Sequence, residues 1–342
     1  MNADEKIVVS GLNVAFRKGG DYVSVVHDIN FSIRSGETLA LVGESGSGKS
    51  VTSLAIMKLL AEAPRTRITG SAMVADSSGK PIDLVGMSEQ QMRHMRGNRV
   101  AMIFQEPLTS LNPVHRIGEQ IAEAIRFHQS LSKADARRRA LDLLEQVGIP
   151  EPLKRLECFP HELSGGMRQR VMIAIALALE PDVLIADEPT TALDVTVQAQ
   201  ILELLRELQR KNGMAILFIT HNFGVVAEIA DRVMVMYAGR IVEQGSVTQV
   251  LSSPRMPYTC GLLAAVPRLE HAGLGQGDLG TIPGYVPDPS APPSGCAFHP
   301  RCAFSLAGRC DSQAPVLEEI EAGHHLRCTR WQELPLAQGG VR

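Results

Sequence analysis

The chain has 342 residues, of which 44% are apolar and 21% are charged. At about 150 residues per domain, this length predicts two domains with ample material for a hydrophobic core. The composition is ordinary for a globular protein and excludes a disordered chain, a fibrous repeat and a charge-rich coiled coil. The formal net charge of −3 gives no overall basic field of the kind that favours nucleic acid.

No segment of the sequence is expected to span a membrane. The longest apolar run, Val171 to Leu179, is about half as long as the roughly 20 residues of a spanning helix. The N-terminus reads MNADEKIVVSG and lacks the apolar stretch of a secretory signal. We therefore expect a cytosolic location, where structural disulfides are rare.

Short apolar segments alternate with helical periodicity up to about residue 250. A helical pattern begins after the Gly/Ser loop that follows Val42, and each later strand lies next to another helical stretch. This βαβα order predicts an α/β domain with a largely parallel, buried sheet. The predicted strands cover residues 7–12, 22–26, 29–33, 38–42, 100–104, 183–186, 215–219 and 233–236.

Residues from about 107 to 180 interrupt this alternation with helices only. Ile117–Phe127 and Lys133–Val147 are amphipathic, and Gly148 with Pro150 ends the second helix. The pattern predicts a helical insertion within the α/β domain.

The character of the sequence changes again after about residue 253. Pro, Gly and Cys dominate, and one short helix at Pro257–Ala265 is predicted. We therefore expect a larger domain over 1–253 and a small, loop-rich domain, poor in core residues, over 254–342.

A phosphate-binding loop stands between a predicted strand and a predicted helix. Residues 43–50 read GESGSGKS and match G-x-x-x-x-G-K-[ST]. The glycines let backbone N–H groups surround phosphate oxygens, Lys49 adds a charge for the β- and γ-phosphates, and Ser50 offers a hydroxyl to Mg²⁺. The nucleotide-binding residues expected here are Gly43, Glu44, Ser45, Gly46, Ser47, Gly48, Lys49, Ser50 and Val51.

An acidic pair follows the predicted strand at 183–186. Asp187 stands where a carboxylate at the end of a buried strand can hold Mg²⁺. Glu188 is placed to polarise a water for in-line attack on the γ-phosphorus. A solvated acidic turn is the alternative interpretation of this pair.

The segment LSGGMRQR at 163–170 resembles the signature motif of ABC-type ATPases. The resemblance implies a P-loop ABC-type nucleotide-binding domain with an antiparallel β subdomain and a helical insertion. It also implies that two ATP molecules lie between two such domains, each facing the signature motif of the opposite domain. Met167 stands where the family commonly has Gln. The interface residues that the resemblance implies are Leu163, Ser164, Gly165, Gly166, Met167 and Asp194.

Other members of the family pattern occur in the same order along the chain. Gln105 matches the glutamine that senses Mg²⁺ and the γ-phosphate, and His221 matches the switch histidine that contacts the γ-phosphate. The resemblance therefore implies that Glu188, His221 and Gln105 carry the catalytic step. It also implies that Gln105 joins Ser50 and Asp187 as a Mg²⁺ ligand.

The family stacks the adenine base on an aromatic side chain upstream of the phosphate loop. Phe16 and Tyr22 both qualify, and Phe16 fits the family spacing better. A core aromatic is the alternative role for either residue.

Four of the six cysteines lie after residue 295, with the spacing C-x5-C-x7-C-x17-C. Four soft thiolates in a loop-rich tail suit tetrahedral zinc or an iron–sulfur cluster. With the segments PYT at 257–259, GLL at 261–263 and VP at 266–267, then Gly-Cys, Pro-Arg-Cys and a later Cys, this tail is similar to the C-terminal extension of dipeptide/oligopeptide permease ATPases, members of which carry a 4Fe–4S cluster here. The resemblance favours that cluster, with zinc or no metal as alternatives. The expected ligands are Cys296, Cys302, Cys310 and Cys328, with His299, His324 and His325 as nearby alternatives.

The whole chain thus resembles the ATP-binding subunits of dipeptide/oligopeptide ABC transporters. The resemblance implies an ATP-hydrolysing subunit that powers peptide uptake, with ATP and Mg²⁺ as cofactors. An importer ATPase for nickel or another small solute is an alternative. A non-transport ABC ATPase acting on nucleic acid or ribosomes is an alternative from a different class, but the chain has neither a long heptad insertion nor a second cassette.

The same resemblance implies the partners and the location. The partners are a second ATPase subunit, for which a paralogue is favoured, and two transmembrane permease subunits. An extracytoplasmic solute-binding protein is an indirect partner, and no nucleic acid is expected. The implied location is peripheral, at the cytoplasmic face of the cell (inner) membrane.

Overall fold

The structure is a computed structural model that describes residues 2, 4–61, 64–76, 78–106, 110–191, 193–266 and 281–335. The start of the predicted helical insertion, 107–109, lies outside the described residues. So do 267–280 and 336–342 of the predicted C-terminal domain.

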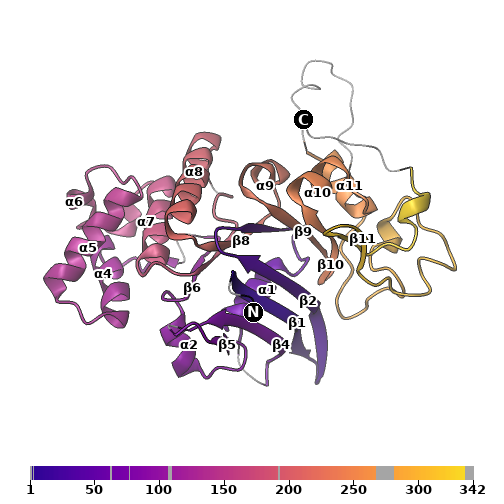
Figure 1. The fold of residues 1–342 in the computed structure, drawn as a ribbon, viewed down its shortest axis with the longest axis horizontal. Helices are drawn as coiled ribbons and strands as arrows, with labels where there is room; N and C mark the ends of the chain where they lie inside the picture. The colour runs from indigo at the N-terminus through magenta and orange to yellow at the C-terminus, as the bar shows by residue number, and fades with distance from the viewer. Residues whose placement is uncertain are drawn as a thin grey trace, which may run out of the picture.

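A large sheet runs through the molecule in the order β11-β12-β10-β9-β3-β8-β7-β6 (Figure 1). The strands from β6 to β9 in this order are parallel, and β10, β12 and β11 continue the sheet in antiparallel fashion. The predicted α/β class with a buried, largely parallel sheet is confirmed. The strand bounds are β3 Thr38–Val42, β6 Val100–Ile103, β7 Val183–Asp187, β8 Ala215–Thr220, β9 Arg232–Tyr237, β10 Arg240–Ser246, β11 Glu318–Glu321 and β12 His324–Leu326.

Both faces of the parallel strands are covered. In β8, Ile216 and Phe218 belong to one hydrophobic core, and Leu217 and Ile219 belong to the core on the opposite face. This two-sided burial explains why the strand is a continuous apolar run without polar alternation. The helices that follow the strands are α1 Lys49–Ile56, α8 Val195–Asn212, α9 Phe223–Ile229 and α10 Val247–Ser252.

A second, antiparallel sheet has the order β2-β1-β4-β5 and packs with α1 and α2 below the large sheet in Figure 1. The predicted strands at 7–12, 22–26 and 29–33 are parts of two longer strands. Bulges near Gly11 and Asp28, both with left-handed φ, break the period-2 pattern that sequence reading relies on. The bounds are β1 Glu5–Lys18, β2 Asp21–Arg34, β4 Thr66–Ala75, β5 Pro81–Asp83 and α2 Glu89–Met95.

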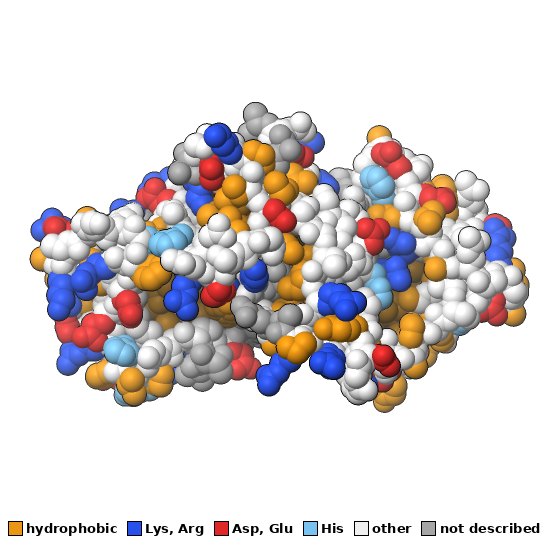
Figure 2. Space-filling model, turned by 90° about the horizontal axis from the view of Figure 1, so that it is seen from below, with side chains coloured by type: hydrophobic (Ala, Val, Ile, Leu, Met, Phe, Trp, Pro, Cys, Tyr) orange, Lys and Arg blue, Asp and Glu red, His pale blue; other side chains and the backbone are white. Residues whose placement is uncertain are grey.

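The helical insertion forms the left end of the molecule in Figure 1. The bounds of α4 and α5 agree with the predicted helices to within one residue. Figure 2 shows acidic and basic side chains intermixed over this end, and Glu157 pairs with Arg116 and Arg137 there. The elements are α4 Ile117–His128, α5 Lys133–Gln146, α6 Pro152–Arg155, η1 Pro160–Glu162 and α7 Gly165–Leu177.

The segment after residue 253 is joined to the large sheet. β12 pairs with β10, and Tyr258 and Phe298 pack on Tyr237 of β9, with ring centroids 4.6 and 5.2 Å from the Tyr237 ring. The tail therefore shares a hydrophobic core with the parallel strands, and the domain boundary at 253 stays a prediction. Its elements are α11 Pro257–Ala264, η3 His299–Arg301, β11, β12 and η4 Trp331–Glu333.

Within the described ranges, no helix is both long enough and apolar enough to cross a bilayer.

Candidate nucleotide site

The phosphate loop leaves the buried strand β3 and enters α1. Gly43 lies so close to β9 that a Cβ there would stand 2.2 Å from the Met236 carbonyl oxygen. Gly46 and Gly48 have φ of +80° and +105°, a left-handed backbone that favours glycine. The loop thus has glycine at the positions where a side chain would clash or the backbone is left-handed. This backbone conformation lets N–H groups surround phosphate oxygens.

Lys49 opens α1 and folds its ammonium group back over the loop. Its Nζ donates to the carbonyl oxygens of Gly43 at 2.7 Å and Glu44 at 3.0 Å. Burial lowers the pKa of Lys49, whereas the carboxylates of Glu188, Asp187 and Glu44 raise it. A cation held in this way beside the loop can accept a phosphate as its counter-ion.

Ser50 and Asp187 meet at the start of α1. Asp187 closes the buried strand β7, and its Oδ1 accepts a hydrogen bond from Ser50 Oγ at 3.2 Å. Burial raises the pKa of Asp187, and the hydrogen bond from Ser50 opposes that effect. A hydroxyl and a carboxylate oxygen are ligands that Mg²⁺ prefers, so this pair fits the expected metal site.

Glu188 is contacted by one side chain of its own loop and by side chains from two other segments. Its Oε2 accepts from Gln105 Nε2 at 3.1 Å and from Thr191 Oγ1 at 2.9 Å, and its Oε1 lies 3.2 Å from His221 Nδ1. The Glu188 backbone has φ of +46°, and its N–H donates to the Ile219 carbonyl at 2.9 Å. The structure therefore brings the predicted residues Glu188, Gln105 and His221 into direct contact.

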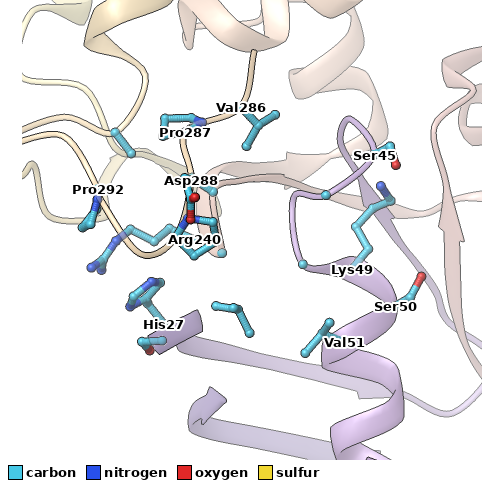
Figure 3. A pocket seen from close by; sticks show the side chains of 18 of the residues that line it. His27, Ser45, Lys49, Ser50, Val51, Arg240, Val286, Pro287, Asp288 and Pro292 are labelled. Carbon is cyan, nitrogen blue, oxygen red and sulfur yellow. The ribbon is translucent and has the colours of Figure 1, made fainter. Parts of the chain in front are cut away.

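Two adjoining cavities, of about 490 and 950 Å³, lie over the phosphate loop. Figure 3 shows the first between α1 and a segment of the tail, residues 286–293. The second reaches Thr191 and His221. The predicted residues that line one or both cavities are Gly43, Glu44, Ser45, Gly46, Gly48, Lys49, Ser50, Val51, Gln105, Glu188 and His221.

Neither predicted base-stacking aromatic lines these cavities. The Arg67 guanidinium covers the Tyr22 ring at 4.0 Å from its centroid, and Phe16 packs partly buried against the core. The wall across from α1 has His27 and Arg240 instead (Figure 3). Burial and the charge of Arg240 lower the pKa of His27, which favours its neutral imidazole. The stacking role of Phe16 or Tyr22 stays a prediction.

The signature segment lies at the N-terminus of α7. Ser164 caps this helix by accepting from the Met167 N–H at 3.4 Å, and Asp194 caps α8 by accepting from the Val197 N–H at 3.0 Å. The Ser164 and Asp194 side chains are both exposed. The predicted interface residues that line neither cavity are Leu163, Ser164, Gly165, Gly166, Met167 and Asp194.

Sequence reasoning missed the residues through which the tail contacts the phosphate loop. Arg301 Nη1 and Nη2 donate to Glu44 Oε2 and Oε1 at 2.7 and 3.0 Å, and Tyr258 Oη accepts from the Glu44 N–H at 2.9 Å. Arg301 stands directly before Cys302 in a Pro-Arg-Cys segment, where the sequence predicts a role for the cysteine alone. No local pattern could have found this contact, because the two residues are 257 positions apart.

The four tail cysteines line one small cavity of about 20 Å³. Burial raises the pKa of Cys296 to about 11, and the other three cysteines add to the rise. His299 lines the same cavity, whereas His324 is buried against Glu243 at 3.0 Å. Across the described ranges, no group of three or more His, Cys, Asp or Glu side chains is arranged to hold a metal ion.

Comparison with known families matches both parts of the chain. The ABC transporter family model matches residues 26–191. The model of the oligopeptide/dipeptide transporter C-terminal region matches residues 242–310. The chain is thus similar to an ABC ATPase and to the extension found in peptide transporters.

Solved structures of ATP-binding cassettes have the same fold. The cassette MJ0796, in a dimeric post-hydrolysis state bound to ADP and Pi, has a TM-score of 0.61 and 25% identity, covering 70% of this chain and 98% of that one. CbiO1 of Clostridium perfringens, part of the transporter complex cbiONQ, has a TM-score of 0.59 and 29% identity, covering 72% and 90%. The predicted nucleotide-binding domain with an antiparallel β subdomain is therefore confirmed.

Relatives of higher identity span almost the whole chain. The oligopeptide transport ATP-binding protein OppD of Bacillus subtilis is 52% identical over 319 residues, covering 93% of this chain and 87% of that one. A Brucella melitensis relative, whose name refers to peptide import and ATP binding, is 53% identical over 329 residues, covering 95% and 97%. By this likeness across both parts, the chain belongs to the family of ATP-binding subunits of ABC peptide importers and is an ATPase.

Proposed function

We propose that Glu188 is the general base of ATP hydrolysis in this importer subunit. The observation that carries the proposal is the set of contacts that Gln105, Thr191 and His221 make with its carboxylate. A carboxylate held there can take a proton from a water as the water oxygen bonds to the γ-phosphorus. The bond from that phosphorus to the ADP oxygen then breaks, and ADP leaves with the electron pair.

The neighbouring residues have complementary roles in this proposal. Ser50 and Asp187 would hold Mg²⁺ with Gln105, and the bound ion neutralises charge on the phosphate oxygens. Lys49 pairs with the β- and γ-phosphates. His221 orients Glu188 and faces the γ-phosphate from the second cavity, which it lines.

Glu188→Gln tests the assignment. We expect ATP hydrolysis to fall by at least about 100-fold, because the amide cannot accept the proton, while the affinity for ATP stays within about twofold. The measurements are phosphate release and binding of a fluorescent ATP analogue. Glu203→Gln on the exposed side of α8 is the matched control, and we expect wild-type hydrolysis from it. Wild-type turnover in Glu188→Gln would remove Glu188 from this role.

We further propose that the site is completed by a second ATPase subunit, with a paralogue favoured. The exposed N-terminus of α7, capped by Ser164, lines neither cavity over the chain's own phosphate loop. Such a helix end attracts an anion, so it suits the γ-phosphate held by another subunit. The dimeric state in which MJ0796 was solved supports the arrangement. Glu188→Gln mixed with the paralogous subunit should elute as a dimer in gel filtration with ATP and as two monomers without it.

The proposed place of work is the cytoplasmic face of the cell membrane, on two permease subunits that receive peptides from an extracytoplasmic solute-binding protein. Gln105 contacts Glu188 shortly before the helical insertion begins, so nucleotide-dependent movement there can reach a partner that contacts α4 to α6. Membrane fractionation tests this location. The chain should sediment with membranes when the permease genes are present and stay in the supernatant when they are deleted.

The four tail cysteines are the ligands of a 4Fe–4S cluster in this proposal. All four line one cavity, although the side chains of the described ranges are not arranged as a metal site, and four thiols are the usual donor set of such a cluster. The cluster, when bound, would add folding free energy to a tail with few regular elements. Iron and acid-labile sulfide should be found at about four per chain after anaerobic purification. Folded protein that contains zinc at one per chain, or no metal, would overturn the assignment.

A further inference from the structure

The tail reaches the phosphate loop through one buried arginine. Arg301 is 5% exposed on its side chain, and its guanidinium forms two hydrogen bonds with the Glu44 carboxylate. Its Nε donates to the Pro283 carbonyl at 2.8 Å. The Tyr258 hydroxyl accepts from the Glu44 backbone N–H. Glu44, the second residue of the loop, is thus held at both its side chain and its backbone by residues of the tail.

The Glu44 carboxylate stands where an uncompensated charge would oppose the ligand. Glu44, Ser45, Gly46 and Arg301 line the same cavity over the loop, and Glu44 is close enough to Lys49 to raise its pKa. An unpaired Glu44 carboxylate in this cavity would repel the triphosphate and would compete with it for the Lys49 ammonium. The bidentate pair with Arg301 neutralises it.

The same arginine also anchors the wall of the nucleotide cavity. Its contacts with the carbonyls of Ile282 and Pro283 come directly before the segment 286–293, which faces α1 in Figure 3. Movement of Arg301 would therefore displace the loop on one side of the cavity and the tail segment on the other. One side chain therefore contacts both the loop and the chain segment that leads into the wall.

We propose that Arg301 is a positioning residue for ATP, which neutralises Glu44 and fixes the phosphate loop so that the C-terminal tail sets the affinity for nucleotide. This inference rests on the proposed role of the loop in holding ATP. It assigns to the tail a part in the hydrolytic site, through a side chain that need not touch the substrate.

Arg301→Gln is the main test, with KM and kcat for ATP and direct binding of a fluorescent ATP analogue as readouts. We expect KM to rise about tenfold, because Glu44 is then unpaired, while kcat changes by less than about twofold. The double variant Glu44→Gln/Arg301→Gln should return KM to within about threefold of wild type, since no bare carboxylate remains. Arg309→Gln removes another ion pair of the tail, with Glu333, and should leave KM unchanged.

The outcomes separate this inference from the proposed function. Lys49→Ala should lose ATP binding, and if it does not, the proposed role of the loop fails. If Lys49→Ala loses binding but Arg301→Gln keeps the wild-type KM, only the role of Arg301 fails. Equal defects in Arg301→Gln and the double variant would also overturn it, since charge neutralisation would then be irrelevant. If Arg301→Gln does not fold, Arg301→Lys replaces it, and it should raise KM by a smaller factor because a single ammonium cannot form the bidentate pair.

Discussion

The phosphate-loop region and the C-terminal tail border the same cavity, but different forces position them. The loop is fixed by backbone: β3 pairs with β8 and β9, and Gly43 lies against the Met236 carbonyl. The tail has short elements, and side-chain pairs such as Arg301–Glu44 and Glu243–His324 tie it to the rest. Substitutions that add side-chain atoms should therefore destabilise the loop region most. Substitutions that remove a charged group should destabilise the tail most.

Among the substitutions that test this comparison, Gly43→Ala should have the largest effect on ATP binding and stability. A Cβ would stand 2.2 Å from the Met236 carbonyl oxygen, so either the loop or β9 must move. We expect ATP binding to be lost and the free energy of unfolding to fall by about 3 kcal/mol. Urea unfolding and binding of a fluorescent ATP analogue measure the two effects.

Gly46→Ala is the matched control within the same loop. Gly46 has φ of +80° with no atom within 4 Å of a Cβ, so only backbone strain of about 1 kcal/mol is expected. Equal loss of stability in Gly43→Ala and Gly46→Ala would show that contact with β9 does not fix the loop. The claim that backbone contacts position the phosphate loop would then be wrong.

The same difference explains what the sequence could and could not predict. The phosphate loop, Asp187, Glu188, Gln105 and His221 follow strands or stand at fixed spacings, so local patterns locate them. The parallel sheet follows from its continuous apolar runs. Such patterns reach only a few residues along the chain.

The missed features depend on contacts between distant segments. Arg301 meets Glu44 across 257 positions, and β12 pairs with β10, where Glu243 and His324 meet across 81 positions. No periodicity or spacing encodes such contacts, because either partner alone resembles a solvated charge. The full length of β1 and β2 was not predicted for another reason. The bulges near Gly11 and Asp28 each insert a residue, which shifts the alternation of apolar and polar residues that predicts a strand.

Glu243→Gln tests the side-chain half of the comparison. Glu243 is fully buried, accepts from the backbone N–H groups of Arg255 and Met256, and contacts His324 Nε2 at 3.0 Å. The amide would turn an N–H toward at least one donor, so we expect a loss of about 2 kcal/mol in the free energy of unfolding. The measurement is the urea midpoint at pH 7.

Glu321→Gln provides the matched control for this carboxylate. Glu321 pairs with Arg255 at 3.8 Å, and both side chains are exposed. Its removal should change the unfolding free energy by less than about 0.5 kcal/mol. If Glu243→Gln proves as mild as Glu321→Gln, the buried polar contacts of Glu243 do not hold the tail.

The smallest expected effect tests whether water is excluded where the tail packs on the sheet. The buried thiol of Cys260 in α11 is the probe. Burial, with a contribution from the Glu243 charge, raises the pKa of Cys260 from 9.0 to about 12. A raised pKa means that the folded protein keeps the thiol proton more tightly than the unfolded chain does. The associated stability is therefore fully present below about pH 9 and is lost as the pH rises through 12. At pH 10 the loss should be about 1 kcal/mol relative to pH 8.

Cys260→Ser isolates this contribution, because it removes the thiol and leaves the other titrating groups in place. From pH 8 to pH 10, the urea midpoint should fall further for the wild type than for the variant. Equal falls would mean that water reaches Cys260 and that the tail packs loosely on the sheet. A loosely packed tail would not hold Arg301 in its two hydrogen bonds of 2.7 and 3.0 Å with Glu44, so equal falls would also argue against neutralisation of Glu44 by Arg301.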